Sequence, residues 1–171
     1  MIRNILEFTG LFIAMTLLQV ICSHICIFGI AVPLIFIYFI VRLPINLSVN
    51  WVMTLAFILG LIIDTFNNTQ GMNALSCTLI AALRKPIFSL YFSREDDLTH
   101  PIPSIKSLGT AIYIKYLLSI VFVFCSLLFL IQSFSLNDIQ LTLGRILGST
   151  ILTTLLLFGI DSLVSAREKR L

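Results

Sequence analysis

The strongest constraint on this chain is a succession of long apolar runs separated by short polar stretches. The runs span residues 5–21, 27–41, 49–63, 72–83, 108–131 and 143–164. Hydrophobic residues make up 58% of the 171-residue chain and charged residues only 11%, whereas about a quarter of the residues in an average globular domain are charged. A soluble fold of this length could not bury so much apolar surface. The sequence therefore predicts an all-α, polytopic membrane protein with a single integral domain.

The number of runs sets the expected topology. A helix that crosses a hydrocarbon layer of about 30 Å needs roughly 20 residues, so the runs predict about six transmembrane helices. The first two runs are the hardest to separate, because only a weakly polar stretch interrupts them. Pro33 suits the first turn of a helix better than its interior, so an alternative places a loop at residues 22–32 and starts the second helix near Pro33. Residues 84–107 are predicted to form a cytoplasmic loop.

The positive charges support this topology. With six spans and a cytoplasmic N-terminus, Arg145 is the only basic residue expected on the outer side, and the other ten of the 11 Lys and Arg residues fall inside. This bias is the positive-inside pattern, and it predicts that both termini are cytoplasmic. The acidic residues Asp161 and Glu168 are expected at a solvated helix end. The inner basic residues are Arg3, Arg42, Arg84, Lys85, Arg94, Lys106, Lys115, Arg167, Lys169 and Arg170.

One carboxylate, Asp64, ends the third apolar run, and a polar turn that closes with Gly71 follows it. An ionised carboxylate costs roughly 2.5–3.5 kcal/mol at the centre of a membrane and less near an interface, so its presence needs a reason. Gly60 lies one turn earlier on the same helix face and would let another backbone approach. Two roles are open for Asp64. It caps the turn by accepting hydrogen bonds from the N–H groups of the next helix, or it contacts a partner protein, an ion or a solute. The outer cation Arg145 is a candidate ion-pair partner if the third and sixth helices are neighbours.

Small residues form two patterns that permit close helix packing. The fourth predicted helix carries a stripe of small residues on one face, and the sixth opens with a GxxxG sequence. Packing within this chain is favoured over packing against the helix of a partner. The stripe comprises Gly71, Ala74, Thr78 and Ala82, and the GxxxG glycines are Gly144 and Gly148.

The sequence offers little for catalysis or metal binding. Asp64 alone cannot serve as both acid and base, and no serine or cysteine has a plausible base beside it, so we expect no enzymatic activity. Cys22, His24 and Cys26 lie close together, but their apolar flanks supply no further ligand and no hydrogen-bonding shell. We therefore expect no metal site, no cofactor and no nucleic-acid partner.

The stretch that begins at Gly60 resembles the bacterial rod shape-determining MreD family. That family carries a span ending in G-L-x-x-D, a short polar turn, a glycine and an apolar helix that begins with a small residue. The corresponding residues here are Gly60-Leu61-Ile62-Ile63-Asp64, then TFNNTQ, then Gly71-Met72-Asn73-Ala74-Leu75. The resemblance extends over the layout of the whole chain, including Pro33 near the second helix and the basic C-terminus, but about thirty residues carry its specific motif.

The resemblance implies a non-catalytic scaffold of the cell-wall elongation machinery in the bacterial inner membrane. Members of the family maintain cell shape by acting with a bitopic partner, MreC. They work beside the MreB filament, RodA and its transpeptidase, which take part in peptidoglycan synthesis. The resemblance makes the motif residues the expected partner-binding or structural site, namely Gly60, Asp64, Gly71, Asn73 and Ala74.

A second function follows from the fold of the family, which is thought to be similar to the six-helix substrate-binding subunits of energy-coupling-factor vitamin transporters. Such a subunit captures a vitamin or another micronutrient in a pocket that opens outward. The polar groups available for a pocket are Asn67, Asn68, Gln70 and Asn73, with Asp64 beside them. The first helix lacks the pair of small residues through which such subunits usually dock, so we favour the scaffold.

Overall fold

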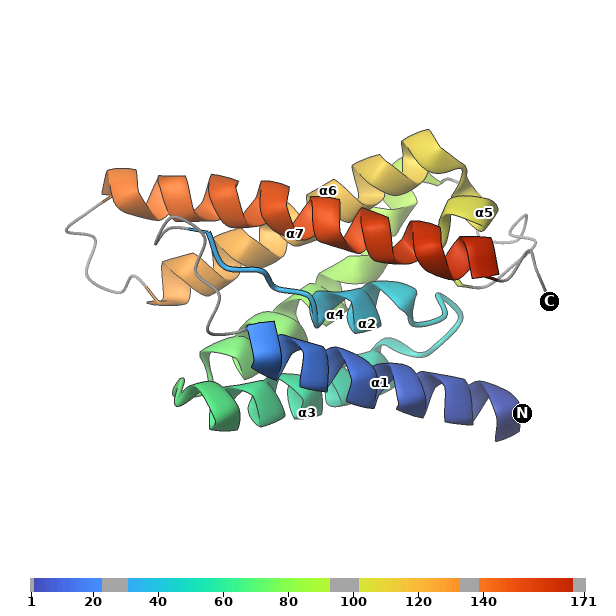
Figure 1. Cartoon of the computed structure of the whole chain (residues 1–171), viewed down its shortest axis with the longest axis horizontal. Helices are drawn as coiled ribbons and strands as arrows, with labels where there is room; N and C mark the ends of the chain where they lie inside the picture. Colours follow the sequence, from blue (N-terminus) through green and yellow to red (C-terminus); the bar gives the residue numbers. More distant parts are fainter. Residues whose placement is uncertain (1, 23–30, 93–101, 133–138, 168–171) are drawn as a thin grey trace.

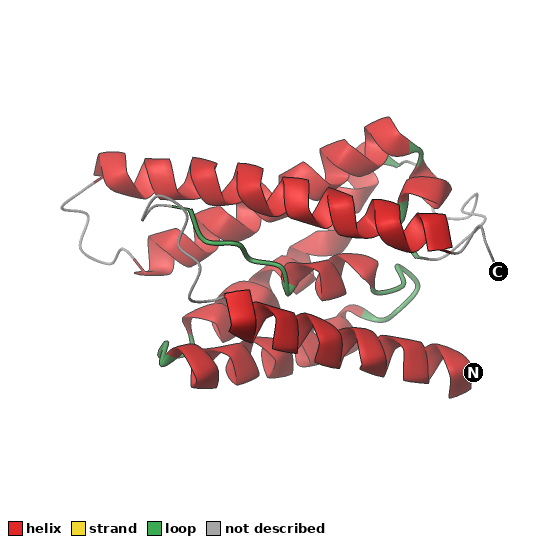
Figure 2. Cartoon of the chain, viewed as in Figure 1, coloured by secondary structure: helices red, strands yellow, loops and turns green. Residues whose placement is uncertain are grey.

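The computed structural model describes residues 2–22, 31–92, 102–132 and 139–167. In these residues the regular elements are helices (Figures 1 and 2). Helices long and apolar enough to cross a membrane span residues 49–67, 110–132 and 140–164, and a shorter apolar helix spans residues 8–22. The prediction of an all-α chain with membrane-length apolar helices is confirmed. The helices are α1 (Ile2–Cys22), α2 (Ile37–Arg42), α3 (Val49–Asn67), α4 (Met72–Tyr91), α5 (Ile105–Leu108), α6 (Thr110–Gln132) and α7 (Ile139–Arg167).

The long helices run side by side along one axis. α1 begins at the end of the bundle where α7 ends, which we call the terminal end (Figure 1). α3 and α4 meet at the opposite end, which we call the hairpin end. α1 packs against α3, α3 against α4, α4 against α6 and α6 against α7. α4 therefore joins the α1–α3 half of the bundle to the α6–α7 half.

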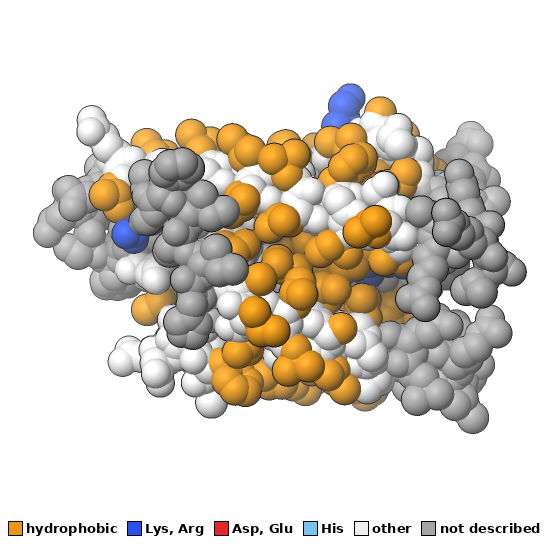
Figure 3. Space-filling model, viewed as in Figure 1, with side chains coloured by type: hydrophobic (Ala, Val, Ile, Leu, Met, Phe, Trp, Pro, Cys, Tyr) orange, Lys and Arg blue, Asp and Glu red, His pale blue; other side chains and the backbone are white. Residues whose placement is uncertain are grey.

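Apolar side chains remain exposed along the outer faces of the long helices. Leu17 of α1, Phe57 of α3 and Leu155 of α7 are examples, and Leu155 is 66% exposed. Apolar side chains also cover much of the face formed by α1 and α7 (Figure 3). Soluble proteins rarely expose such a continuous apolar surface, whereas the hydrocarbon of a membrane covers it without cost.

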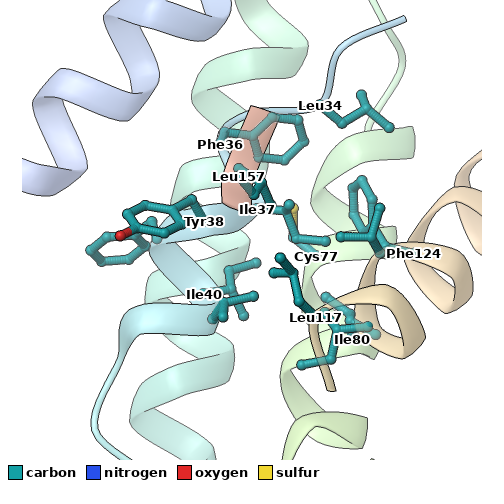
Figure 4. Packing of buried hydrophobic residues seen from close by; sticks show 14 of the residues in the cluster. Leu34, Phe36, Ile37, Tyr38, Ile40, Cys77, Ile80, Leu117, Phe124 and Leu157 are labelled. Carbon is teal, nitrogen blue, oxygen red and sulfur yellow. The ribbon is translucent and has the colours of Figure 1, made fainter. Parts of the chain in front are cut away.

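The centre of the bundle is occupied by residues 31–36, which are not helical, and by the short helix α2, and we call the two together the central segment. Every residue from Leu34 to Val41 is at most 4% exposed. Side chains of α4, α6 and α7 surround this segment, including Cys77, Leu117 and Leu157 (Figure 4). A segment that is apolar on all sides has no face suited to water, so other elements enclose it completely.

The predicted second helix over residues 27–41 is wrong where the structure describes it. Residues 31–36 are not helical and α2 begins only at Ile37, while residues 23–30 of the predicted helix lie outside the described residues. Pro33 explains part of the difference, because proline has no N–H group and disfavours the helical conformation of the residue before it. The alternative of a late start near Pro33 is closer to the structure than the full-length helix.

Side chains from α1 and α7 supply the hydrogen bonds that residues 31–36 do not make within a helix. Gln19 of α1 donates from Nε2 to the carbonyl of Pro33 at 3.0 Å, and its Oε1 accepts from the N–H of Ile35 at 2.8 Å. On the opposite side, Ser149 and Thr153 of α7 accept from the backbone. Their hydroxyls bind the N–H groups of Val32 at 3.0 Å and Leu34 at 3.1 Å. Buried backbone groups need such partners because no water reaches them.

α4 is longer than predicted and corrects the predicted cytoplasmic loop over residues 84–107. The helix continues to Tyr91 with Pro86 inside it, and α5 forms later in the same stretch. Phe88 is buried against α6, where its ring meets that of Tyr116 edge-on at 5.4 Å. A proline inside a helix costs about 3 kcal/mol, so we attribute the continuation to burial of this face. Residues 93–101 of the predicted loop lie outside the described residues.

α3 and α4 approach each other closely at Gly60. A Cβ atom on Gly60 would lie 2.4 Å from the Cα of Ala74 and 2.8 Å from the carbonyl oxygen of Asn73. The expectation that Gly60 lets another backbone approach is therefore confirmed. Gly148 of the GxxxG sequence makes an ordinary contact instead, because a Cβ there would lie 3.4 Å from the Cβ of Ala31.

We predict that Gly60→Ala lowers the free energy of unfolding by about 1–3 kcal/mol, because the added methyl group forces the two backbones apart. Gly159→Ala on α7 is the matched control, since a Cβ there meets nothing within 4 Å. The control should be neutral or slightly stabilising, because alanine favours a helix more than glycine does. Thermal unfolding of the purified variants in one detergent measures both effects, and equal Tm values for the two variants would contradict the prediction.

Candidate functional site

The motif that begins at Gly60 forms the tight hairpin between α3 and α4. Asn68 ends α3 in the left-handed conformation with φ 53°, and its N–H bonds the carbonyl of Asp64. The N–H of Thr69 bonds the same carbonyl at 3.1 Å. Gly71 then starts α4 with φ 77°. Asparagine and glycine adopt positive φ more readily than other residues, so the sequence NNTQG suits this turn.

The Asp64 carboxylate fastens the start of α4 to the end of α3. Its Oδ1 accepts from the N–H of Asn73 at 3.1 Å, from Nδ2 of Asn73 at 2.9 Å and from the hydroxyl of Thr69. Its Oδ2 accepts from the N–H of Ala74 at 2.9 Å. Asp64 is only 5% exposed. The first N–H groups of a helix have no partner inside the helix and carry its positive dipole end, so a carboxylate stabilises them strongly.

These bonds confirm the capping role for Asp64, which was one of the two roles left open. Gly60, Asp64, Gly71, Asn73 and Ala74 come together at this hairpin, as the motif implied. Gly60 supplies the close approach, Gly71 supplies the turn, and the other three make the hydrogen bonds.

The predicted ion pair between Asp64 and Arg145 is replaced by other contacts. α3 packs against α1 and α4, while α7 packs against α5 and α6, so the two helices are not the neighbours that the pair requires. Arg145 instead lines a small cavity of about 40 Å³ with Phe129, Gln132 and Thr142. The carboxylate of Asp64 is already occupied by four hydrogen bonds.

Part of the small-residue stripe of α4 packs against another helix of this chain. Ala74 is buried against α3 beside Gly60. The hydroxyl of Thr78 donates to the carbonyl of Ala74 at 2.7 Å within the same helix, and Thr78 and Ala82 remain half-buried. The end of the stripe near Gly71 therefore packs within the α3–α4 hairpin.

A cavity of about 110 Å³ lies beside the hairpin. α1, residues 31–36, the α3–α4 turn and the end of α6 enclose it, and its eleven lining residues are all uncharged. Gln19, Asn67, Thr69, Asn73 and Gln132 supply its polar side chains. Two of the amides proposed for a pocket, Asn67 and Asn73, line this cavity, whereas Asn68 and Gln70 line a separate shallow depression that also includes Asp64.

A second buried carboxylate, Asp161 of α7, corrects the expectation of a solvated helix end. Asp161 is completely buried. Its Oδ1 accepts from the hydroxyl of Tyr38 at 2.8 Å and pairs with Arg42 at 3.1 Å. Its Oδ2 accepts from the N–H of Ile105, at the start of α5, at 3.2 Å. Asp161 thus joins α2, α5 and α7 at the terminal end of the bundle, while Glu168 lies outside the described residues.

Arg84 of α4 is buried as well, although the sequence places it among the basic residues of a loop. It is 2% exposed. Its guanidinium donates to the carbonyl of Ile40 at 2.9 Å and to that of Pro44 at 2.8 Å. These carbonyls lie at the C-terminal end of α2, where a helix leaves acceptors without partners and a cation is favoured. Arg84 therefore fixes the end of the central segment to α4.

Within the described residues, no group of three or more His, Cys, Asp or Glu side chains is placed to hold a metal ion. Cys22 is a free thiol at the end of α1, and His24 and Cys26 lie outside the described residues. No family model, curated protein or solved structure matches this chain.

We predict that Asp64→Ala lowers the free energy of unfolding by about 2–4 kcal/mol, because it leaves the N–H groups of Asn73 and Ala74 without their acceptor. Asp64→Asn keeps one acceptor oxygen and should lose less. Thr65→Val is the control, since within the described residues the Thr65 hydroxyl bonds only the carbonyl of Leu61 in its own helix. Chemical unfolding in detergent micelles checks the order of the three variants, and equal stability of Asp64→Ala and the control would contradict it.

A further prediction concerns the anchor at the other end of the bundle. Asp161→Ala should loosen α5, because Ile105 loses its acceptor and Arg42 loses its counter-ion. Trypsin should then cleave after Lys106 about tenfold faster for every 1.4 kcal/mol by which the free energy of local opening falls. The exposed neighbour Ser162 provides the control variant Ser162→Ala. Unchanged cleavage of Asp161→Ala relative to this control would show that Asp161 does not hold α5.

Proposed function

We propose that this chain belongs to the MreD family and is a non-catalytic scaffold of the cell-wall elongation machinery in the bacterial inner membrane. The observation that carries the proposal is the hairpin itself. The residues that resemble the family motif lie in one hairpin, in which Gly60 allows the close approach and Asp64 bonds the N–H groups of Asn73 and Ala74. A motif that builds a rigid hairpin suits a protein that presents a fixed surface to a partner.

The proposed topology has six membrane crossings and both termini in the cytoplasm. α1, α3, α4, α6 and α7 supply five of the crossings. The central segment supplies the other, because six non-helical residues reach up to about 20 Å and the six residues of α2 add about 9 Å. Their sum is close to the ~30 Å thickness of the hydrocarbon layer. The start of α1 and the end of α7 at one end of the bundle support this arrangement.

In this scaffold Asp64 acts on the partner indirectly. Its carboxylate is buried and fully bonded, so it holds the hairpin in shape while neighbouring exposed side chains make the contact. Leu61 and Phe66 of α3 and Leu75 of α4 are exposed near the hairpin. We propose that the transmembrane helix of an MreC-like bitopic protein packs on this surface. At the terminal end, Asp161 and Arg84 bond α2, α5 and the end of the central segment to the rest of the bundle. We propose that this end couples the partner to MreB, RodA and its transpeptidase.

We predict that Asp64→Ala reduces recovery of the MreC-like protein about tenfold or more when the tagged chain is crosslinked in native membranes, purified and analysed by mass spectrometry. The physical reason is that the hairpin loses its shape when Asn73 and Ala74 lose their acceptor. Thr65→Val should recover the partner at the wild-type level. Equal recovery with Asp64→Ala at matched protein levels would refute the role of the hairpin.

A second candidate function is supported by the cavity beside the hairpin, whose free amides could hold a small solute. In this alternative the chain is the substrate-capturing subunit of a vitamin or micronutrient transporter. The same purification discriminates the two functions. Recovery of paired ATPases with a coupling membrane subunit, in place of an MreC-like protein and wall synthases, would favour transport.

A further inference from the structure

We propose that the cavity beside the hairpin is a binding site for a small, uncharged sugar. The proposal goes beyond the scaffold role and does not depend on it. It rests on three features of the cavity: hydrogen-bonding groups that no other described residue uses, the absence of charged side chains from its lining, and apolar side chains beside the polar groups.

The unused hydrogen-bonding groups are side-chain amides. Asn67 and Gln132 line the cavity, and among the described residues their side chains make no hydrogen bond. Asn73 is buried, and its Nδ2 donates to Asp64 and Thr69, which leaves its Oδ1 as a free acceptor. Amides both donate and accept hydrogen bonds, so the three together suit a ligand that carries hydroxyl or acetamido groups.

The absence of charge restricts the ligand further. None of the eleven lining residues is Asp, Glu, Lys or Arg. Arg145 lines the neighbouring cavity and not this one, so a charged molecule held among these residues would lose water without gaining a counter-ion, which is strongly unfavourable. Phosphates, carboxylates and amines are therefore poor ligands here, and neutral polar molecules are the suitable class.

Part of the cavity lining is apolar. Phe36, Leu128 and Phe129 contribute to it, and all three are largely buried in the bundle. A sugar ring has hydroxyl groups around its rim and C–H groups on its faces, so it can place one face against these apolar side chains and its rim against the amides. The cavity of about 110 Å³ is partly open and too small for a whole sugar, so part of the ring and its substituents would enter it and displace the water there.

The test uses the full chain in lipid nanodiscs and N-acetylglucosamine as the probe. We expect N-acetylglucosamine to raise the Tm in a saturable manner, by about 2–4 °C near saturation. Glucuronate, a sugar of similar size with a carboxylate, should give no rise. No saturable rise with N-acetylglucosamine, or an equal rise with glucuronate, would overturn the proposal.

Variants locate the binding. The double variant Asn67→Leu with Gln132→Leu removes two amides that bond nothing else in the described structure, and it should weaken binding at least tenfold. Gln70→Leu is the matched control, because Gln70 lies on the same turn but outside the cavity, and it should bind like the wild type. Equal binding by the double variant would place the sugar elsewhere and overturn the proposal.

A direct measurement covers the case in which the double variant is too unstable for a thermal scan. Equilibrium dialysis with radiolabelled N-acetylglucosamine compares the wild type with the single variant Gln132→Leu, whose side chain is exposed. A weaker affinity of Gln132→Leu supports the site, and an unchanged affinity contradicts it. Neither result depends on recovery of an MreC-like partner, so this test of the sugar site is independent of the test of the scaffold.

Discussion

Every polar backbone group in the apolar interior needs a hydrogen-bond partner, and the structure depends on how residues 31–36 meet this requirement. A helix would satisfy the requirement by itself, but this segment is not helical and passes through the centre of the bundle. Gln19 on one side and Ser149 with Thr153 on the other bind its N–H and carbonyl groups. These bonds hold α1 and α7 on either side of the segment. The central position of α2 follows from this arrangement, and so does the packing of α1, α4, α6 and α7 around it.

The two ends of the bundle are secured by the same kind of interaction. At the hairpin end, a buried carboxylate binds the first N–H groups of the next helix. At the terminal end, Asp161 binds the first N–H of α5 together with Tyr38 and Arg42 of the central segment. Arg84 binds carbonyls at the close of α2. Each charged group thus lies against a helix end of opposite sign, which offsets its removal from water.

The sequence predicts those parts of this arrangement that depend on neighbouring residues. Hydropathy gives the membrane-length helices over residues 49–67, 110–132 and 140–164, but the equally apolar run over residues 27–41 does not form one helix where the structure describes it. The capping role of Asp64 can be inferred because Asn73 and Ala74 follow it by nine and ten residues. The anchor at Asp161 could not be inferred in this way, because Tyr38 and Arg42 precede it by 123 and 119 residues. The spacing of Ser149 and Thr153 on one helix face was an available signal, but it does not identify the backbone that they bind.

The bonds between α7 and residues 31–36 also bear on the order in which the chain can assemble. Ser149 and Thr153 follow their backbone partners by 117 and 119 residues. A chain synthesised from its N-terminus therefore exposes residues 31–36 well before the helix that completes their hydrogen bonds exists. Until then, Gln19 is the only one of the three side chains available to bond the segment. Helix α7 thus closes the interior of the protein, and a chain that stops before Ser149 lacks a finished core, however well its earlier helices are inserted.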